Sequence, residues 1–186
     1  MANKVLFGFK NLYIGTYSVS TTGVVTLATP YHQAGAVGFS PDTSANDYDF
    51  YADDIPYYSD YSDGPIEGDL EVAMFDDAVK TSYMGYAALT GGGIAQVKGA
   101  IRPNIYLAAE LEGDAEKRRV LFLNGKFGPI TRSYQTKGET VEVQTETAPV
   151  KFVGDNNTGV TMATYKPTDT GYSNLFTSPT VPTLAT

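Results

Sequence analysis

The chain contains no cysteine and only one histidine, His32. Without cysteine there can be no disulfide, no thiolate metal site and no cysteine nucleophile. A transition-metal site would depend on His32 and carboxylates alone, so we predict no metal site and no cofactor. We interpret His32, which lies just after Pro30, as a turn or surface residue instead of a general base.

Long apolar runs are missing as well. The apolar residues 5–9 lie between Lys4 and Lys10 and form a stretch far shorter than the core of a signal peptide. No other run is long enough to cross a bilayer. We therefore expect a protein that is made in a cytoplasm, stays soluble and has no membrane partner.

Charged residues are scarce, at 18% of the chain, and acids outnumber bases, giving a formal net charge of −8 and a pI of about 4.5. Such a surface repels polyanions, which argues against an ordinary DNA-binding protein. The 19 glycines, 10 prolines and 14 tyrosines favour strands joined by turns. With 186 residues, we expect one domain over residues 1–176 with extended arms or loops.

Alternating side chains predict that most of the domain is β-sheet. In residues 66–74, apolar Ile66, Leu70 and Val72 alternate with acidic residues, which is the period of a half-buried strand. Similar patterns bounded by Gly, Asn or Pro predict further strands at residues 5–9, 12–19, 24–29, 94–98, 105–111, 118–126, 141–147, 150–153 and 160–166. So many short strands indicate a mainly β protein, a sandwich or partial barrel.

One short helix is predicted beside the sheet, over residues 77–84. Asp76 can cap its start, Val79 and Tyr83 share a face, and Gly85 can close its end. A helix this short needs packing against a sheet to be stable.

Two segments fit no regular element. Residues 41–64 read as a long inter-strand loop that is both acidic and aromatic, and loops of this length are usually functional or disordered. Residues 177–186 are rich in Ser, Thr and Pro, which predicts an extended C-terminal arm. The large apolar side chains of the loop are Tyr48, Phe50, Tyr51, Ile55, Tyr57, Tyr58 and Tyr61.

The carboxylates allow two other classes of function. Paired acids such as Asp53-Asp54 could serve an acid-catalysed hydrolase, but only if two carboxylates converge across a cleft. Residues 47–54 could bind calcium, although they lack the spacing of a calcium loop. A surface-exposed carbohydrate- or calcium-binding β-sandwich module is therefore the alternative function. We expect no enzyme activity.

Charge is divided along the chain. Twelve carboxylates and no Lys or Arg lie between Asp42 and Asp77, whereas ten of the 13 basic residues follow Lys80. This division suggests that the acidic region meets a basic region of a neighbouring molecule. The candidate inter-subunit basic residues are Arg102, Lys117, Arg118 and Arg119.

Three stretches resemble the major tail proteins of siphophages and prophages of Gram-positive bacteria. They are ANKVLFGFKNLYIG at residues 2–15, FYADDIPYYSDYSDGPIEGDLEVAMF at residues 50–75 and KRRVLFLNGKFGPITRSYQTKGETVEVQTET at residues 117–147. The similarity runs over roughly the first 150 residues. The similarity lies in the order and pattern of residues along these stretches, because the family has no short catalytic signature.

The resemblance implies a β-sandwich or partial barrel with one flanking helix. Six copies would close into a ring, and stacked rings would form the tail tube of a virion, which conducts DNA to the host without binding it specifically. It also implies tape-measure, tail-terminator and distal tail proteins as partners. We expect Glu67, Asp69 and Glu71 to face the tube lumen, and the loop at 41–64 to pack on neighbouring copies.

Overall fold

The computed structural model describes residues 8–52, 54–112, 116–136 and 144–184. In these residues the chain is mainly β, with one helix and no closed barrel. This confirms the predicted fold class. The elements are β1 (Phe9–Val19), β2 (Val25–Leu27), β3 (Tyr31–Gln33), β4 (Ala36–Ala52), β5 (Ile55–Val72), α1 (Asp77–Tyr83), β6 (Tyr86–Ala88), β7 (Ile94–Gln96), β8 (Ile105–Leu111), β9 (Arg119–Phe127), β10 (Thr131–Arg132), β11 (Glu146–Phe152) and β12 (Met162–Tyr165).

A large antiparallel sheet is the frame of the molecule. Its strand order is β2-β1-β8-β9-β11-β5-β4. In addition, β3 pairs with β1, β10 with β11 and β12 with β9. The central strand β8 is buried along almost its whole length, as a strand covered on both faces must be. Strands β6 and β7 form a separate two-stranded sheet.

The sheet has a hydrophobic cluster on each face. In β8, Ile105 and Leu107 belong to the larger cluster, whereas Tyr106 and Ala108, which alternate with them, belong to the smaller one. Successive side chains of a strand point to opposite faces, so the two clusters lie on opposite sides of the sheet. Residues of α1 cover the larger cluster, and the C-terminal segment covers the smaller one with Leu175.

Helix α1 forms where the sequence predicts it, although its start is stabilised differently. Asp76 has the extended backbone of an N-cap residue but makes no side-chain cap hydrogen bond. Its carboxylate instead accepts a 2.9 Å hydrogen bond from the Tyr31 hydroxyl. Gly85 follows the helix with a φ of 74°, the left-handed conformation that glycine adopts most easily.

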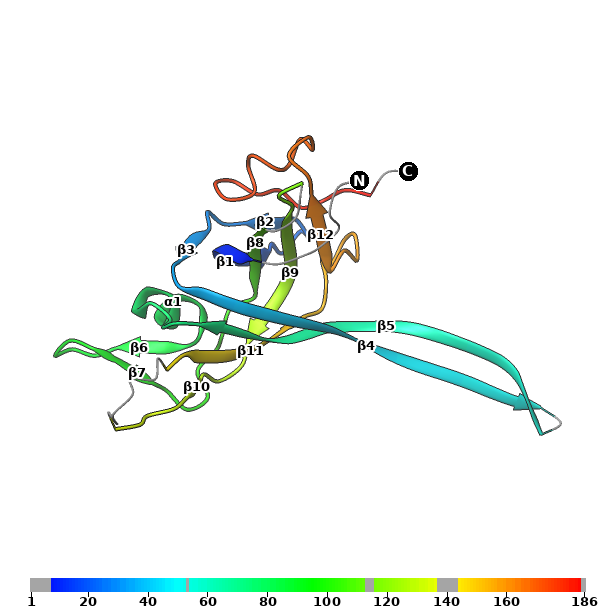
Figure 1. Cartoon of the computed structure of the whole chain (residues 1–186), viewed down its shortest axis with the longest axis horizontal. Helices are drawn as coiled ribbons and strands as arrows, with labels where there is room; N and C mark the ends of the chain where they lie inside the picture. Colours follow the sequence, from blue (N-terminus) through cyan, green and yellow to red (C-terminus); the bar gives the residue numbers. More distant parts are fainter. Residues whose placement is uncertain (1–7, 53, 113–115, 137–143, 185–186) are drawn as a thin grey trace.

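The main correction concerns residues 41–64, which are not a loop. They form the outer part of β4 and β5, paired from Thr43 and Ile66 out to Ala52 and Ile55. Figure 1 shows this hairpin leaving the sheet and projecting far beyond the rest of the molecule. Backbone pairing defines these strands without a core on either face, so the hydrophobic alternation that identifies half-buried strands is absent.

Most other predicted strands are present within a few residues. Those predicted at 12–19, 24–29, 66–74, 94–98, 105–111, 118–126, 150–153 and 160–166 overlap β1, β2, β5, β7, β8, β9, β11 and β12. The strand predicted at 5–9 overlaps the described chain only at its end, and 141–143 of the strand at 141–147 lie outside the described residues. Strands β3, β6 and β10 are short and were not predicted.

Candidate assembly surfaces

The projecting part of the hairpin is the first candidate surface, and we call residues 44–64 the arm. Its large apolar side chains are exposed, between 50% for Phe50 and 75% for Tyr57. Aromatic side chains of the core behave oppositely, since Phe75 and Phe152 are fully buried. The seven exposed residues are those singled out in the sequence, namely Tyr48, Phe50, Tyr51, Ile55, Tyr57, Tyr58 and Tyr61.

The arm is held together by backbone pairing and short polar contacts. Phe50 pairs with Tyr58 across the hairpin, and register shifts lie next to this pair and near the root of the arm. The Ser59 hydroxyl donates to Asp49, and the Tyr58 hydroxyl donates to Asp60 at 2.9 Å. These contacts stay within the arm, so they do not bury its aromatic rings.

The arm is also acidic throughout. Residues 44–64 contain six aspartates and neither Lys nor Arg. All basic residues therefore lie outside the arm. A partner that covers the tyrosines must also accommodate this negative charge.

The second candidate surface is the face of β5 that points away from the core. Leu70 and Val72 are fully buried, whereas Glu67 and Asp69 are exposed. This is the alternation that the sequence predicts for the acids, with Glu71 half-buried on the same face. Thr145 donates a 2.5 Å hydrogen bond to Glu71.

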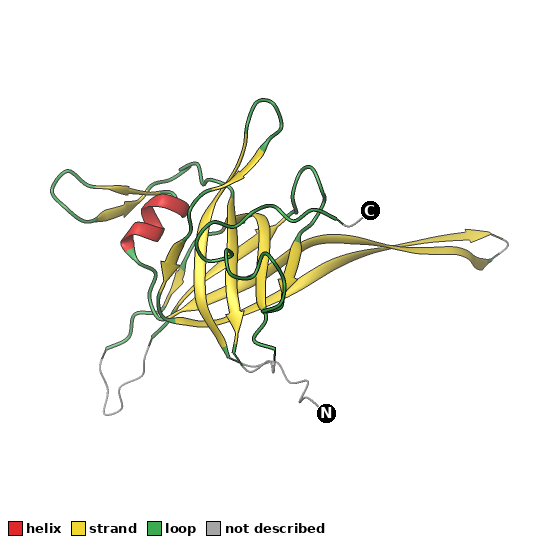
Figure 2. Cartoon of the chain, turned by 90° about the horizontal axis from the view of Figure 1, so that it is seen from above, coloured by secondary structure: helices red, strands yellow, loops and turns green. Residues whose placement is uncertain are grey.

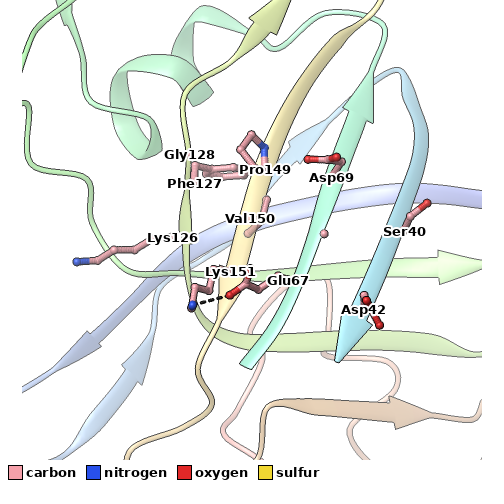
Figure 3. Close-up of a pocket in the computed structure, with 11 residues that line it drawn as sticks. Ser40, Asp42, Glu67, Asp69, Lys126, Phe127, Gly128, Pro149, Val150 and Lys151 are labelled. Atoms are coloured by element: carbon pink, nitrogen blue, oxygen red, sulfur yellow. Dashed lines mark ion pairs between the residues drawn. The ribbon is translucent and has the colours of Figure 1, made fainter. Parts of the chain in front are cut away.

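Lysines from neighbouring strands stand beside these acids. Lys151 on β11 lies opposite Glu67 and forms a 2.5 Å ion pair with it, as Figure 3 shows. Lys126 on β9 lies opposite Lys151 in the sheet. These residues line an open groove of about 490 Å³ together with Asp42 and Asp69. The face is thus less negative than its acids alone suggest.

Two of the predicted inter-subunit basic residues are engaged within the chain. The Arg119 guanidinium lies 3.4 Å from Glu110 and stacks 4.0 Å from the ring centre of Tyr172 and 4.1 Å from that of Phe176. Arg118 forms a 2.9 Å ion pair with Glu116. The structure therefore gives both residues a role inside their own subunit.

The other two basic residues form no direct ion pair with another described residue. Arg102 donates to the carbonyl oxygens of Met84 and Phe127, at 3.1 and 3.2 Å, and is half-buried. Lys117 is exposed, and its carbonyl accepts a 2.9 Å hydrogen bond from Tyr172. An inter-subunit role stays a prediction for all four basic residues.

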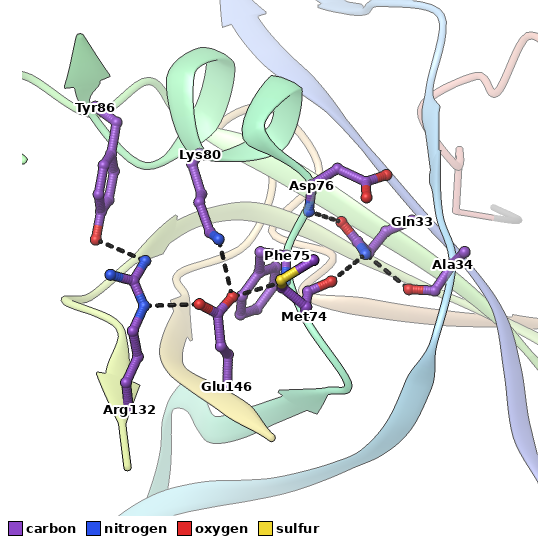
Figure 4. A network of polar contacts seen from close by, with 9 residues as sticks. All are labelled: Gln33, Ala34, Met74, Phe75, Asp76, Lys80, Tyr86, Arg132 and Glu146. Atoms are coloured by element: carbon purple, nitrogen blue, oxygen red, sulfur yellow. Dashed lines mark hydrogen bonds and ion pairs between the residues drawn. The ribbon is translucent and has the colours of Figure 1, made fainter. Parts of the chain in front are cut away.

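A buried polar network ties the root of the hairpin to the rest of the fold. Glu146 on β11 accepts a 2.7 Å hydrogen bond from the backbone of Phe75, just after β5. It also pairs with Lys80 of α1 at 3.1 Å and with Arg132 of β10 at 2.7 Å. Figure 4 shows these groups converging on one carboxylate.

Burial and hydrogen bonding act in opposite directions on Glu146. Burial alone would raise the pKa of this carboxyl, but the Phe75 N–H and the cations Lys80 and Arg132 outweigh it and hold the pKa below its ordinary value. The side chain of Lys80 is only 6% exposed, so its charge depends on Glu146 for compensation. No local sequence pattern predicts this pair, because strands β6 to β10 lie between Lys80 and Glu146 in the chain.

Gln33 completes the network on the other side. Its amide nitrogen donates to the carbonyls of Ala34 and Met74, at 2.7 and 3.0 Å, and its oxygen accepts from the Asp76 N–H at 3.1 Å. The neighbouring His32 is exposed, with its ring centre 4.9 Å from that of Tyr13.

The described chain offers little that resembles a metal or membrane site. Within residues 8–52, 54–112, 116–136 and 144–184, no three His, Asp or Glu side chains are placed to hold a metal ion. No helix in the described part of the chain is long and apolar enough to span a membrane.

Comparison with known proteins identifies the fold only. No protein-family model and no curated protein matches the chain. Among solved structures, the tube-terminating cap of the anti-feeding prophage aligns with a TM-score of 0.53 at 7% identity, covering 89% of this chain and 95% of the cap. The sheath-tube complex of an extracellular contractile injection system in its extended state gives 0.43 at 8% identity, over 84% and 88%. The likeness to the cap shows a shared fold, whereas the TM-score of the sheath-tube complex is too low to carry an argument.

Proposed function

We propose that this chain is a structural subunit of a phage-tail-like tube and not an enzyme. The observation that carries the proposal is the arm, an acidic and aromatic hairpin whose large apolar side chains are at least 50% exposed among the described residues. Aromatic residues gather on surfaces that become buried on association. The fold shared with a tube-terminating cap over 89% of the chain supports the same role.

Six copies would close into a ring, and rings would stack into the tube. A ring needs a heterologous interface, in which one patch of a subunit binds a different patch of the next. Strand β4 ends the sheet and pairs only with β5 among the described strands. Its free edge offers backbone groups to a strand of a neighbouring copy.

We place Glu67, Asp69 and Glu71 on the tube lumen, where a negative lining keeps phosphates from sticking to the wall as DNA passes. The exposure of Glu67 and Asp69 on the face away from the core supports this. The ion pair of Glu67 with Lys151 makes Asp69 the strongest uncompensated charge of the three. Replacing all three acids with Lys should leave rings intact and slow DNA ejection from reconstituted tails, and ejection at the normal rate would refute this placement.

In this proposal the protein is made in a bacterial host cytoplasm and becomes part of the virion. Tape-measure, tail-terminator and distal tail proteins would be its partners, together with further copies of itself. DNA would pass through without a specific binding site, and no membrane contact is required.

The arm can be removed cleanly to test the proposal. Thr43 and Ile66 are cross-strand partners, so an Asn-Gly turn in place of residues 44–65 can close the shortened hairpin. We expect this variant to stay folded, with a cooperative unfolding transition like that of the full-length protein, and to form no rings or tubes under the electron microscope. Tubes of normal length from the shortened protein would overturn the role of the arm.

A tube-terminating cap is the second candidate, because the solved structure with the shared fold is a cap. A cap subunit closes a ring but does not propagate a tube. Electron microscopy of the purified protein at increasing concentration separates the two, since stacked rings that lengthen with concentration indicate a tube protein. Single or paired rings at every concentration indicate a cap.

A further inference from the structure

The β6–β7 hairpin has one face that stays largely exposed among the described residues. Ala87 lies opposite Ala95, and a 3.0 Å hydrogen bond from the Leu89 N–H to the Gly93 carbonyl extends the pairing by one residue. Side chains alternate along a strand, so Leu89 and Val97 share the face of the two alanines. That face is apolar along its whole length.

The two faces of this hairpin have different surroundings. Tyr86 is buried in the larger hydrophobic cluster, and Ile94 opposite Ala88 packs against that cluster. On the other face, Leu89 is 52% exposed and Val97 is 47% exposed. The alternation therefore leaves an apolar strip facing outward, where no described residue covers it.

The chain that follows the strip adds exposed apolar surface and positive charge. Ile101 is 93% exposed, the highest value among the large apolar side chains that the structure describes. Lys98 is exposed and forms no ion pair with another described residue. Residues 78–109 contain Lys80, Lys98 and Arg102 and not one Asp or Glu. We call residues 86–101 the β6–β7 end.

The β6–β7 end is complementary to the arm in charge and in chemistry. The arm carries six aspartates without Lys or Arg, and the segment around the β6–β7 end carries no acid and exposes Lys98, whereas Lys80 is buried against Glu146. Both surfaces expose large apolar side chains, Tyr58 at 53% on the arm and Leu89 at 52% on the β6–β7 end. Opposite charges around apolar contacts are the pattern of a specific interface.

The two surfaces cannot satisfy each other within one molecule. Figure 1 shows the arm and the β6–β7 hairpin at opposite ends of the longest axis, with the sheet between them. Joining them requires two copies in a head-to-tail arrangement, which is a heterologous contact that can be repeated.

We propose that the β6–β7 end of one copy is the docking site for the arm of a second copy. The proposal rests on the self-assembly proposed above, and it assigns the surface that receives the arm. The tyrosines of the arm lie on the strip formed by Leu89, Ala87, Ala95 and Val97, and Lys98 neutralises aspartates of the arm.

Cross-linking between full-length copies tests the contact directly, because the chain has no cysteine of its own. One variant carries Tyr58→Cys in the arm and the other carries Val97→Cys. We expect a flexible bismaleimide to produce a heterodimer from their mixture. The matched control replaces Val97→Cys with Thr26→Cys, an exposed position on β2, and should give no heterodimer above background. Failure of the Tyr58–Val97 mixture to cross-link at assembly concentrations would overturn the proposal.

A charge reversal adds a second measurement. Lys98→Glu should raise the concentration needed for assembly by about tenfold, as loss of one good interface contact does. Combining Lys98→Glu with Asp60→Lys should recover part of the loss. Unchanged assembly by Lys98→Glu would count against the contact.

The two proposals fail in distinguishable ways. If the wild-type protein forms no rings or tubes but the cysteine pair cross-links, the arm docks on the β6–β7 end and the tube function is wrong. If wild-type tubes form and the cysteine pair does not cross-link, the tube function holds and the arm docks elsewhere.

Discussion

The arm and the sheet use the same residue types in opposite ways. Phe50 on the arm is 50% exposed, whereas Phe152 in the sheet is fully buried and lies 5.2 Å from Phe122, measured between ring centres. Both residues belong to antiparallel strands of one continuous sheet. Strand pairing is therefore common to the two regions, and burial of side chains is not.

The difference shows that the two regions are stabilised by different interactions. The sheet gains from apolar surface removed from water on both of its faces, at about 25 cal/mol per Å². The arm has backbone hydrogen bonds and local contacts such as Ser59 to Asp49, but an isolated two-stranded hairpin is marginal in water. This difference is the basis of our proposal that another molecule completes the contacts of the arm.

The largest expected effect separates the two regions by stability. Phe152→Ala should lower the free energy of unfolding by about 4 kcal/mol, because it opens a cavity in the larger cluster. Phe50→Ala, the matched change on the arm, should alter it by less than about 0.5 kcal/mol. Urea unfolding measures both values. A loss of several kcal/mol at Phe50 would mean that the arm is part of the cooperative core.

The next effect tests the network at the root of the hairpin. Glu146→Gln should lower the free energy of unfolding by about 3 kcal/mol, because it leaves the Lys80 charge buried without compensation. Glu67→Gln, which breaks an exposed ion pair with Lys151, should cost less than about 1 kcal/mol. Urea unfolding at neutral pH compares the two variants. Equal losses of unfolding free energy would contradict the role of Glu146 in compensating the buried charge of Lys80.

The same network gives stability a pH dependence. The pKa of Glu146 is lower in the folded protein than the ordinary value of 4.5, so the unfolded state takes up a proton first as the pH falls. Its contribution is therefore complete well above pH 4.5 and is lost as the pH falls through the folded pKa. The free energy of unfolding, measured from neutral to acidic pH, should depend less steeply on pH in Glu146→Gln than in wild type. An unchanged slope against pH would contradict this.

The last prediction concerns local motion and needs no substitution, because it is measured on the wild-type protein. Backbone amides of the arm should exchange with solvent at least about a hundredfold faster than those of the central strands β8 and β9, since local opening of the arm exposes no core. Hydrogen exchange followed by mass spectrometry measures the ratio. Assembly should remove the difference, because docking buries the arm. Equal protection in the free protein would show that the arm is already packed.

Part of this description could be predicted from the sequence. The alternation of Ile66, Leu70 and Val72 with acids identified the half-buried part of β5, because a strand with one face on a core repeats every two residues. Helix α1 was predicted for the same kind of reason, from Val79 and Tyr83 one turn apart. The large apolar residues of the arm were also singled out in the sequence, and the structure shows them exposed; their contact with another copy stays a prediction.

Other features were decided by tertiary structure alone. The arm has no buried face, so Tyr, Asp, Pro and Gly at residues 44–64 read as loop, and only the pairing of β4 with β5 makes them strands. The polar network of Glu146, Lys80 and Arg132 joins residues far apart in the chain, and no local pattern encodes it. Local patterns report the environment of single elements, because periodicity records which face is buried. Which elements meet, and which surface stays open for another copy, follows from the way the whole chain packs.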